Sequence, residues 1–293
     1  MNTQTTAVFG EVLFDCFPSG ERLLGGAPFN VAWHLQALGQ ATQFISRVGQ
    51  DAQGLAIREA MLSWGMDVSD VQSDAGHVTG TVQVSFEQDQ PRYAILTEQA
   101  YDFIDAGQLK QGDYGVIYHG TLALRHHVSA QALQSLKARQ RTKVFIDVNL
   151  RAPWWQKNVI ESYLPQAHWL KLNDEELQHW QQTGETLKQT MQRLLVDYAL
   201  EVLIVTRGAQ GAIALPALGD FIEIMPSDGV EVIDTVGAGD AFAAVLLLGM
   251  QQGWSLTMTM QRAQDFASAV VGRRGALLYD KAFYANFCKL WAL

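Results

Sequence analysis

Asp234-Thr235-Val236-Gly237-Ala238-Gly239-Asp240 is the stretch that decides the fold, and an apolar run over residues 241–250 follows it directly. The pattern predicts a helix that begins at the glycines and holds Asp240 in its first turn. The first backbone N–H groups of a helix have no partner within it and lie at the positive end of its dipole. We therefore expect an anion or a phosphate group to bind here, where glycine leaves the approach free of a Cβ atom.

The composition is that of a globular protein with a large core. The chain has 293 residues, of which 48% are hydrophobic and 17% are charged. Its net charge of −9 disfavours nucleic acid as a partner, because binding a polyanion depends on Lys and Arg that neutralise phosphates. The apolar run over residues 241–250 is shorter than the roughly 20 residues of a membrane-spanning helix, so we expect no membrane segment.

The cysteines indicate the cell compartment. Cys16 and Cys288 are far apart and have no neighbouring Cys or His at the spacing of metal ligands. This pattern favours a reducing compartment without structural zinc, and the cytoplasm is therefore expected.

Predicted strands and predicted helices alternate along the chain. Such alternation builds βαβ units, so the sequence predicts one α/β domain over residues 1–293 with a mainly parallel sheet. The strands are expected at residues 7–15, 42–48, 116–119, 143–149, 168–172 and 202–206, and the helices at 30–38, 52–64, 129–140, 186–199, 241–250, 258–271 and 281–291.

Two segments break this alternation. Residues 79–97 alternate apolar and polar side chains around a turn at Gln88-Asp89-Gln90-Pro91, which predicts a hairpin with one solvated face. Together with residues 16–25 it could form a small flap over a cleft, and an ordinary edge hairpin is the alternative. A second hairpin is predicted over residues 212–225.

Polar side chains stand at or just after the ends of the predicted strands. In open α/β sheets, ligands bind at the carboxyl ends of the strands, so we expect these side chains to surround one site. They are Asp15, His119, Asp147, Asn149, Arg151, Asn173, Glu176 and Thr206.

Three common motifs are absent. The chain has no Gly-x-x-x-x-Gly-Lys-Ser/Thr sequence and no Gly-x-Ser-x-Gly sequence. The glycines at 237 and 239 also fail the dinucleotide-binding pattern, because Phe242 stands at the third glycine position. What remains is a Gly-rich helix start with an acid that can act as a base.

Two segments together resemble the signatures of the ribokinase-like (PfkB) sugar kinases. They are Gly25-Gly26-Ala27-Pro28-Phe29-Asn30-Val31-Ala32 and Asp234-Thr235-Val236-Gly237-Ala238-Gly239-Asp240-Ala241-Phe242. The resemblance covers essentially the whole chain. It implies a three-layer α/β/α sandwich with a mainly parallel central sheet and a small β lid at about residues 16–25 and 79–97. It also implies transfer of the ATP γ-phosphate to a primary hydroxyl of a small sugar.

By this resemblance, Asp240 is the general base that takes the proton of the sugar hydroxyl. Ala238, Gly239 and the N–H of Asp240, in a turn opened by Gly237, form the anion hole for the transferred phosphate, and phosphoryl transfer does need positioning and charge stabilisation of this kind. The helix dipole is expected to keep Asp240 ionised. Arg151 could reach the phosphate or a substrate acid, and a structural ion pair is its alternative role.

The resemblance also implies a sugar site. Asp147-Val148-Asn149-Leu150-Arg151-Ala152-Pro153-Trp154 is similar to a motif of fructokinases and 2-keto-3-deoxygluconate kinases, and Pro28 favours fructokinases. Phe29 replaces a small residue and could reshape the pocket, so the sugar stays open. Conversion of fructose to fructose 6-phosphate is expected. The alternatives are a 2-keto-3-deoxygluconate or nucleoside kinase, a non-catalytic sugar-binding protein and a dinucleotide oxidoreductase. The implied sugar-binding residues are Asp15, Gly25, Gly26, Asn30, Asp147 and Asn149.

Nucleotide and cation sites follow from the same resemblance. Glu176 is implied to place Mg²⁺, and Asp234 to hold a monovalent cation such as K⁺. Because lids of this family sometimes pair between subunits, a homodimer stays open. The implied ATP-binding residues are Asn173, Thr206, Gly208, Gly211, Gly275 and Ala276.

Overall fold

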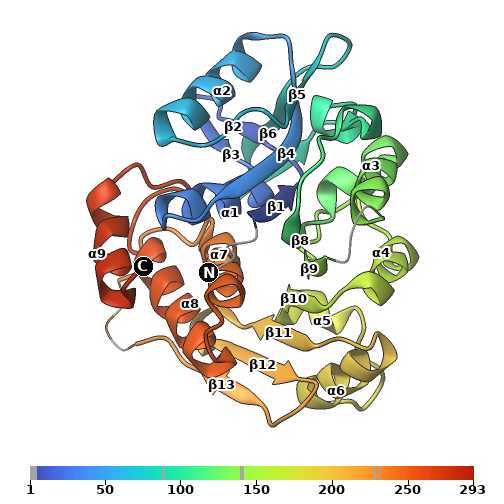
Figure 1. Cartoon of the computed structure of the whole chain (residues 1–293), viewed down its shortest axis with the longest axis vertical. Helices are drawn as coiled ribbons and strands as arrows, with labels where there is room; N and C mark the ends of the chain where they lie inside the picture. Colours follow the sequence, from blue (N-terminus) through green and yellow to red (C-terminus); the bar gives the residue numbers. More distant parts are fainter. Residues whose placement is uncertain (1–4, 88–89, 139–141, 228, 230) are drawn as a thin grey trace.

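The computed structural model describes residues 5–87, 90–138, 142–227, 229 and 231–293. A nine-stranded sheet forms its centre (Figure 1). The seven strands from β5 to β11 across the sheet pair in parallel, and β12 is antiparallel to both of its neighbours, β11 and β13. The prediction of a mainly parallel sheet is thus confirmed. The order across the sheet is β13 (Ile222–Ile224), β12 (Ala212–Pro216), β11 (Val202–Thr206), β10 (Trp169–Asn173), β9 (Lys143–Asp147), β8 (Tyr114–His119), β1 (Thr5–Phe9), β4 (Thr42–Gly49) and β5 (Val71–Asp74).

Helices cover both faces of this sheet, because alternate side chains of each strand point to opposite faces. In β1, for example, Val8 belongs to one core while Ala7 and Phe9 belong to the other. The first core includes residues of α1 (Ala27–Ala37), α2 (Ala52–Trp64), α7 (Ala238–Gln252), α8 (Leu256–Val271) and α9 (Lys281–Trp291). The second includes residues of α3 (His127–Lys137), α4 (Lys157–Tyr163), α5 (Asp174–Gln178) and α6 (Leu187–Asp197).

The prediction of a single strand over residues 7–15 is wrong. The chain leaves the large sheet after Phe9, turns at residues 10–12 and continues in another sheet as β2 (Leu13–Cys16). Gly10 makes the turn possible, because a Cβ atom at this position would lie 2.5 Å from Pro28 Cγ. Because apolar residues stand on both sides of Gly10 and Glu11, the pattern predicts one continuous strand.

The smaller sheet has four strands in the order β3 (Arg22–Gly25), β2, β6 (Gly80–Glu87) and β7 (Gln90–Ile95). Strands β6 and β7 form the predicted antiparallel hairpin, whose turn at residues 88–89 lies outside the described residues. The predicted second hairpin corresponds to β12 and β13. The helix predicted over residues 129–140 begins two residues earlier, and its last two positions are not described. The sequence does not predict β5, α4 or α5.

Helix α7 lies in the middle of the helical layer, between α1 and α8. Its residues from Ala241 to Gly249 are all buried, because the helix is apolar on every side. The surrounding core therefore fixes the position of its first turn. In the described ranges, no helix is both long and apolar enough to cross a bilayer.

Short 3₁₀ helices lie in the connections. They are η1 (Ala100–Phe103), η2 (Ala106–Gln108), η3 (Leu122–Arg125), η4 (Leu164–Gln166) and η5 (Gly208–Gln210).

Candidate functional site

A cavity of about 1130 Å³ lies between the carboxyl ends of the parallel strands and the smaller sheet. Of the site residues predicted from the sequence, Ala238, Gly208, Gly211 and His119 do not line it. The structure brings together the others, which are Asp15, Gly25, Gly26, Asn30, Asp147, Asn149, Arg151, Asn173, Glu176, Thr206, Asp234, Gly237, Gly239, Asp240, Gly275 and Ala276.

Helix α7 begins at Gly237, whose φ of 80° is the left-handed conformation that glycine adopts readily. A Cβ atom at Gly237 would lie 2.5 Å from Ala276 Cβ, so no other residue fits between the two turns. Among the described residues, the backbone N–H groups of Gly239 and Asp240 have no hydrogen-bond acceptor. The start of the helix therefore offers free donors to an anion in the cavity.

Asp240 and Asn30 come from opposite ends of the chain and meet in the cavity. The Asn30 Nδ2 atom donates a hydrogen bond of 2.7 Å to Asp240 Oδ2. Asn30 is buried and its Oδ1 has no hydrogen-bond partner among the described residues. This contact fixes the orientation of the Asp240 carboxyl and leaves the amide oxygen free to accept from a ligand.

Burial raises the pKa of Asp240 to about 6, and the Asp147 carboxylate adds to this shift. The hydrogen bond from Asn30 and the charges of Lys171 and Arg151 act in the opposite direction but do not cancel it. Burial thus outweighs the stabilising contacts, and the pKa lies above its ordinary value. With a pKa of about 6, the carboxyl is mostly ionised at pH 7 and close to the value that suits a general base.

Lys171 is a site residue that the sequence analysis missed. Its Nζ atom is 2.7 Å from Asp147 Oδ2, both side chains are almost fully buried, and the Tyr118 hydroxyl donates a hydrogen bond of 3.2 Å to the same oxygen. Burial lowers the pKa of Lys171, but Asp147 outweighs burial and the pKa lies above its ordinary value. The ammonium group lies 3.6 Å from where a Cβ of Gly239 would be, so a positive charge stands beside the start of α7.

Strand β2 and the start of α1 form another wall of the cavity. A Cβ atom at Gly25 would lie 3.9 Å from both Asp15 Oδ2 and Asn30 Oδ1, so a carboxylate and an amide oxygen approach the same point. Gly26 has a φ of 113°, and a Cβ there would lie 2.7 Å from the Glu11 carbonyl oxygen. Phe29, whose effect on the pocket the sequence leaves open, does not line the cavity and is fully buried in the core against Trp33 and Phe44.

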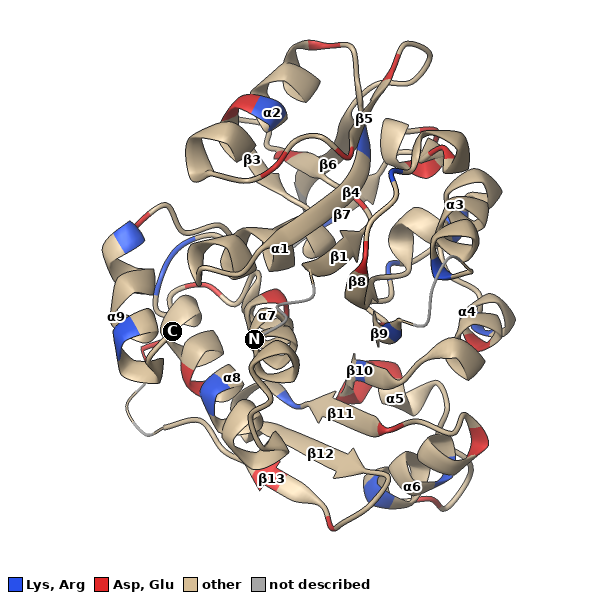
Figure 2. Ribbon diagram, in the orientation of Figure 1, with Lys and Arg blue, Asp and Glu red and all other residues tan. Residues whose placement is uncertain are grey.

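Glu176 and Asn173 form a capping box at the start of α5. Asn173 Oδ1 accepts from the Glu176 N–H at 2.7 Å, and the Glu176 carboxylate accepts from the N–H groups of Asn173 at 2.8 Å and Leu150 at 2.6 Å. Burial raises the pKa of Glu176, and so does the charge of Asp147. Figure 2 shows acidic residues at the starts of both α5 and α7. Glu176 thus anchors the chain at residue 150 to the end of β10.

Asp234 joins two turns beside the start of α7. Its Oδ1 accepts from the Val236 N–H at 3.0 Å, and its Oδ2 accepts from the Gly275 N–H at 2.9 Å. Gly208 and Gly211 lie in the loop after β11, where a Cβ at Gly211 would lie 1.9 Å from the Ile224 carbonyl oxygen. These glycines shape the loop that follows Thr206 and do not themselves reach the cavity wall.

Arg151 and His119, both at predicted strand ends, differ in their placement. Arg151 is exposed and lines the cavity, and its charge acts on Asp15 and Asp240. His119 is fully buried, donates from Nδ1 to the Gly120 carbonyl oxygen at 2.8 Å, and is not part of the cavity wall. Glu11, which the sequence analysis placed inside a strand, does line the cavity. For Lys171 and Glu11, the missed signal is a charged residue within an apolar run.

The chain is similar to known proteins over most of its length. Residues 16–281 match the sequence profile of the pfkB family carbohydrate kinases. A fructokinase from Klebsiella pneumoniae is 32% identical over 259 residues, which cover 83% of this chain and 83% of that protein. The structure of a fructokinase with bound ATP from Xylella fastidiosa has a TM-score of 0.86 at 20% identity and covers 99% of this chain and 100% of its own. A fructokinase double mutant from Vibrio cholerae O395, in a form with bound fructose, ADP and potassium ion, has a TM-score of 0.82 at 24% identity and covers 97% and 98%.

Proposed function

The chain belongs to the pfkB family of carbohydrate kinases, and from this membership we propose that it phosphorylates fructose to fructose 6-phosphate with ATP. The observation that carries the proposal is the 2.7 Å contact between Asn30 and Asp240 at a helix start whose N–H groups are free. It combines a base, a hydroxyl-binding amide and an anion site within one cavity. The relatives named fructokinase support fructose as the sugar.

In the proposed reaction, Asp240 accepts the proton of the primary hydroxyl as the oxygen attacks the γ-phosphate, and the bond from the γ-phosphorus to the bridging oxygen breaks so that ADP leaves. The hydrogen bond from Asn30 keeps the carboxyl oriented, and a pKa of about 6 suits proton transfer near neutral pH. The free N–H groups of Gly239 and Asp240 then stabilise the charge on the transferred group. Lys171 adds a fixed positive charge, which Asp147 holds in place.

The sugar is proposed to bind between Asp15 and Asn30. A carboxylate and an amide accept from and donate to neighbouring hydroxyls, which suits a polyol. Tyr93 and Ile95 of β7 line the same cavity, so the smaller sheet is placed to act as a lid. A closed lid would keep water away from the γ-phosphate and so limit hydrolysis of ATP.

ATP is proposed to extend from the start of α7 toward Thr206 and the turn at Gly275 and Ala276, all of which line the cavity. The described residues contain no group of three or more His, Cys, Asp or Glu that could hold a metal ion. This fits Mg²⁺, which usually arrives on the nucleotide and keeps several water ligands. Asn173 and Glu176 would then meet it through water. When bound, Mg²⁺ neutralises charge on the phosphates.

A monovalent cation such as K⁺ is proposed beside Asp234. Each carboxylate oxygen of Asp234 accepts one backbone hydrogen bond, and a second lone pair on each remains available to a cation. If activity of the wild type depends on K⁺ and that of Asp234→Asn does not, the result would support this placement.

A substrate panel tests the proposed function. ATP consumption is measured with fructose, ribose, 2-keto-3-deoxygluconate, adenosine and fructose phosphates, and the product is identified by phosphorus NMR, which separates fructose 6-phosphate from fructose 1-phosphate. We expect the highest kcat/KM with fructose and a phosphate on the primary hydroxyl at carbon 6. A higher kcat/KM for ribose, 2-keto-3-deoxygluconate or adenosine than for fructose would assign that compound as the substrate. Silence with the whole panel would favour a sugar-binding protein.

A further inference from the structure

Glu11 is a buried acid in the cavity wall, and one of its carboxyl oxygens has no partner. The residue is only 2% exposed, and its Oε2 has no hydrogen-bond partner among the described residues. It lines the cavity that holds Asp240 and Asn30. Because a buried polar oxygen without a partner costs free energy, proteins rarely keep one without a reason. A ligand in the cavity would supply the missing partner.

The backbone holds Glu11 firmly in this position. The residue lies at the crossing from β1 to β2, and two glycines pack closely against that crossing. A Cβ atom at Gly26 would lie 2.7 Å from the Glu11 carbonyl oxygen, and one at Gly80 would lie 2.6 Å from the Val12 carbonyl oxygen. Such close packing leaves the crossing little room to shift, so the carboxyl stays at the cavity.

Two groups near Glu11 on the protein side bond to other residues, although Arg125 Nη1 has no hydrogen-bond partner among the described residues. Arg125, from η3, makes hydrogen bonds of 2.8 and 2.7 Å to the two carboxylate oxygens of Asp102 and one of 3.1 Å to the Tyr101 hydroxyl. The Tyr118 hydroxyl, from β8, donates to Asp147. These groups influence Glu11 electrostatically, but none of them satisfies its Oε2.

The pKa of the Glu11 carboxyl lies close to neutral pH. Burial raises the pKa of Glu11 to about 7, against the lowering effect of a hydrogen bond from its own backbone. Arg151 lowers the pKa, Asp240 raises it, and Arg125 lowers it less. Near pH 7 the group can therefore either donate or accept a hydrogen bond, as a sugar hydroxyl can.

We propose that Glu11 is a specificity-determining residue whose Oε2 hydrogen-bonds a hydroxyl of the acceptor sugar. The proposal rests on the proposed function, because it assigns Glu11 to the same sugar site as Asp15 and Asn30. A site built to hydrogen-bond a substrate hydroxyl discriminates strongly against the analogue that lacks it, since the buried group then stays unpaired. Glu11 thus selects for one hydroxyl of the sugar.

Glu11→Met is the main test variant, because methionine has a similar length and cannot hydrogen-bond at this position. Glu11→Gln is the conservative variant, and Glu161→Met on α4 is the control, with a side chain 36% exposed outside the cavity. The measurements are kcat, the KM values for sugar and ATP, the calorimetric Kd for the sugar and the thermal unfolding midpoint.

We expect Glu11→Met to raise the KM and Kd for the sugar about tenfold or more, the usual effect of a lost hydrogen bond to a buried polar or charged group. The KM for ATP should change less than about twofold, and Glu11→Gln should lie between the wild type and Glu11→Met. The thermal midpoint of Glu11→Met should not fall, because the variant removes an unpaired buried carboxyl. Glu161→Met should match the wild type in every measurement.

A series of deoxy sugars identifies the hydroxyl. One deoxy analogue should bind the wild type weakly and should bind Glu11→Met equally weakly, because it lacks the hydroxyl that Glu11 contacts. The other analogues keep that hydroxyl, so each should bind Glu11→Met more weakly than it binds the wild type. An unchanged sugar KM, or a uniform loss for all analogues with a lower thermal midpoint, would overturn the role of Glu11. A wild type that turns over no sugar contradicts the proposed function itself, so the two failures are distinguishable.

Discussion

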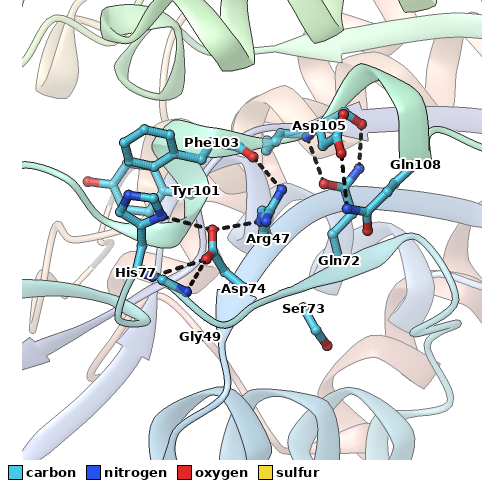
Figure 3. A network of polar contacts seen from close by, with 12 residues as sticks. Arg47, Gly49, Gln72, Ser73, Asp74, His77, Tyr101, Phe103, Asp105 and Gln108 are labelled. Carbon is cyan, nitrogen blue, oxygen red and sulfur yellow. Dashed lines mark hydrogen bonds and ion pairs between the residues drawn. The ribbon is translucent and has the colours of Figure 1, made fainter.

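Asp74 at the end of β5 and Asp240 at the start of α7 are carboxylates with opposite surroundings. Asp74 is the centre of the network in Figure 3, where its Oδ1 accepts from the N–H groups of Gly76 at 2.7 Å and His77 at 3.0 Å. Its Oδ2 lies 2.7 Å from Arg47 Nε and 3.1 Å from His77 Nδ1. Asp240, by contrast, has one side-chain hydrogen bond, which comes from Asn30.

The two surroundings shift the pKa values in opposite directions. Burial would raise the pKa of Asp74, but the hydrogen bonds from Gly76 and His77 and the charge of Arg47 together lower it below its ordinary value. At Asp240 burial prevails and the pKa rises to about 6. A carboxylate that stabilises the fold has all its lone pairs engaged, whereas one that meets a ligand keeps some free.

The largest expected effect is on turnover, in Asp240→Asn. The asparagine oxygen can still accept the hydrogen bond from Asn30, but the side chain cannot take a proton. The kcat should therefore fall by about 10²–10⁴, the usual range for a lost general base, while calorimetry finds sugar and ATP binding retained. Near-normal turnover in this variant would remove Asp240 from the role of base.

Asp74→Asn should instead reduce stability. We expect the free energy of unfolding at pH 7 to fall by about 3 kcal/mol, because Arg47 loses its charged partner in a largely buried network. Since the folded-state pKa of Asp74 lies below the unfolded value of 3.8, its contribution is present above that pH and is lost as the pH falls further. The measurement is urea denaturation at several pH values, with kcat expected to stay unchanged.

The control for this variant is Asp197→Asn. Asp197 forms an exposed pair of 3.4 Å with Arg193 on α6, and its loss should change stability by less than about 0.5 kcal/mol. Equal losses of stability in the two variants, or a loss for Asp74→Asn that does not depend on pH, would contradict the assignment of Asp74 to the framework.

Asp15→Ala should have the smallest of these effects, confined to the sugar. We expect the KM for the sugar to rise about tenfold to a hundredfold, the effect of one lost charged hydrogen bond, with little change in the KM for ATP. The exposed Asp113 before β8 supplies the control variant Asp113→Ala, which should leave both KM values unchanged. Equal increases in the two KM values would move Asp15 out of the sugar site.

The sequence predicts the sheet, the helical layers and most of the cavity wall, because strand ends and the Gly-rich helix start are local signals. The approach of Asn30 to Asp240 is not local, since 210 positions separate the two residues, and only the resemblance placed both in one site. Lys171 and Glu11 were missed because a buried charge inside an apolar run has no periodic pattern. Whether such a charge has a partner can be read only from the folded structure, in which the strands lie side by side.

The sequence also does not predict how the surroundings of a carboxyl group shift its pKa. A helix dipole can be predicted from residues 237–240, but the pKa of Asp240 also depends on burial and on Asn30, Lys171 and Asp147, which come from three other elements. Phe29 illustrates the same limit. It is adjacent to Asn30 in the chain, yet it is buried in the core against Phe44 and does not line the cavity.

Carbon-13 NMR titration of the aspartate carboxyl carbons tests most directly whether the cavity and the framework differ in this way. The two resonances are assigned with Asp240→Asn and Asp74→Asn, and both are followed in one sample without ligands. The account predicts that Asp240 titrates near pH 6 and Asp74 below pH 3.8. Titration of both carboxyls below about pH 4, the ordinary range of aspartate, would contradict it.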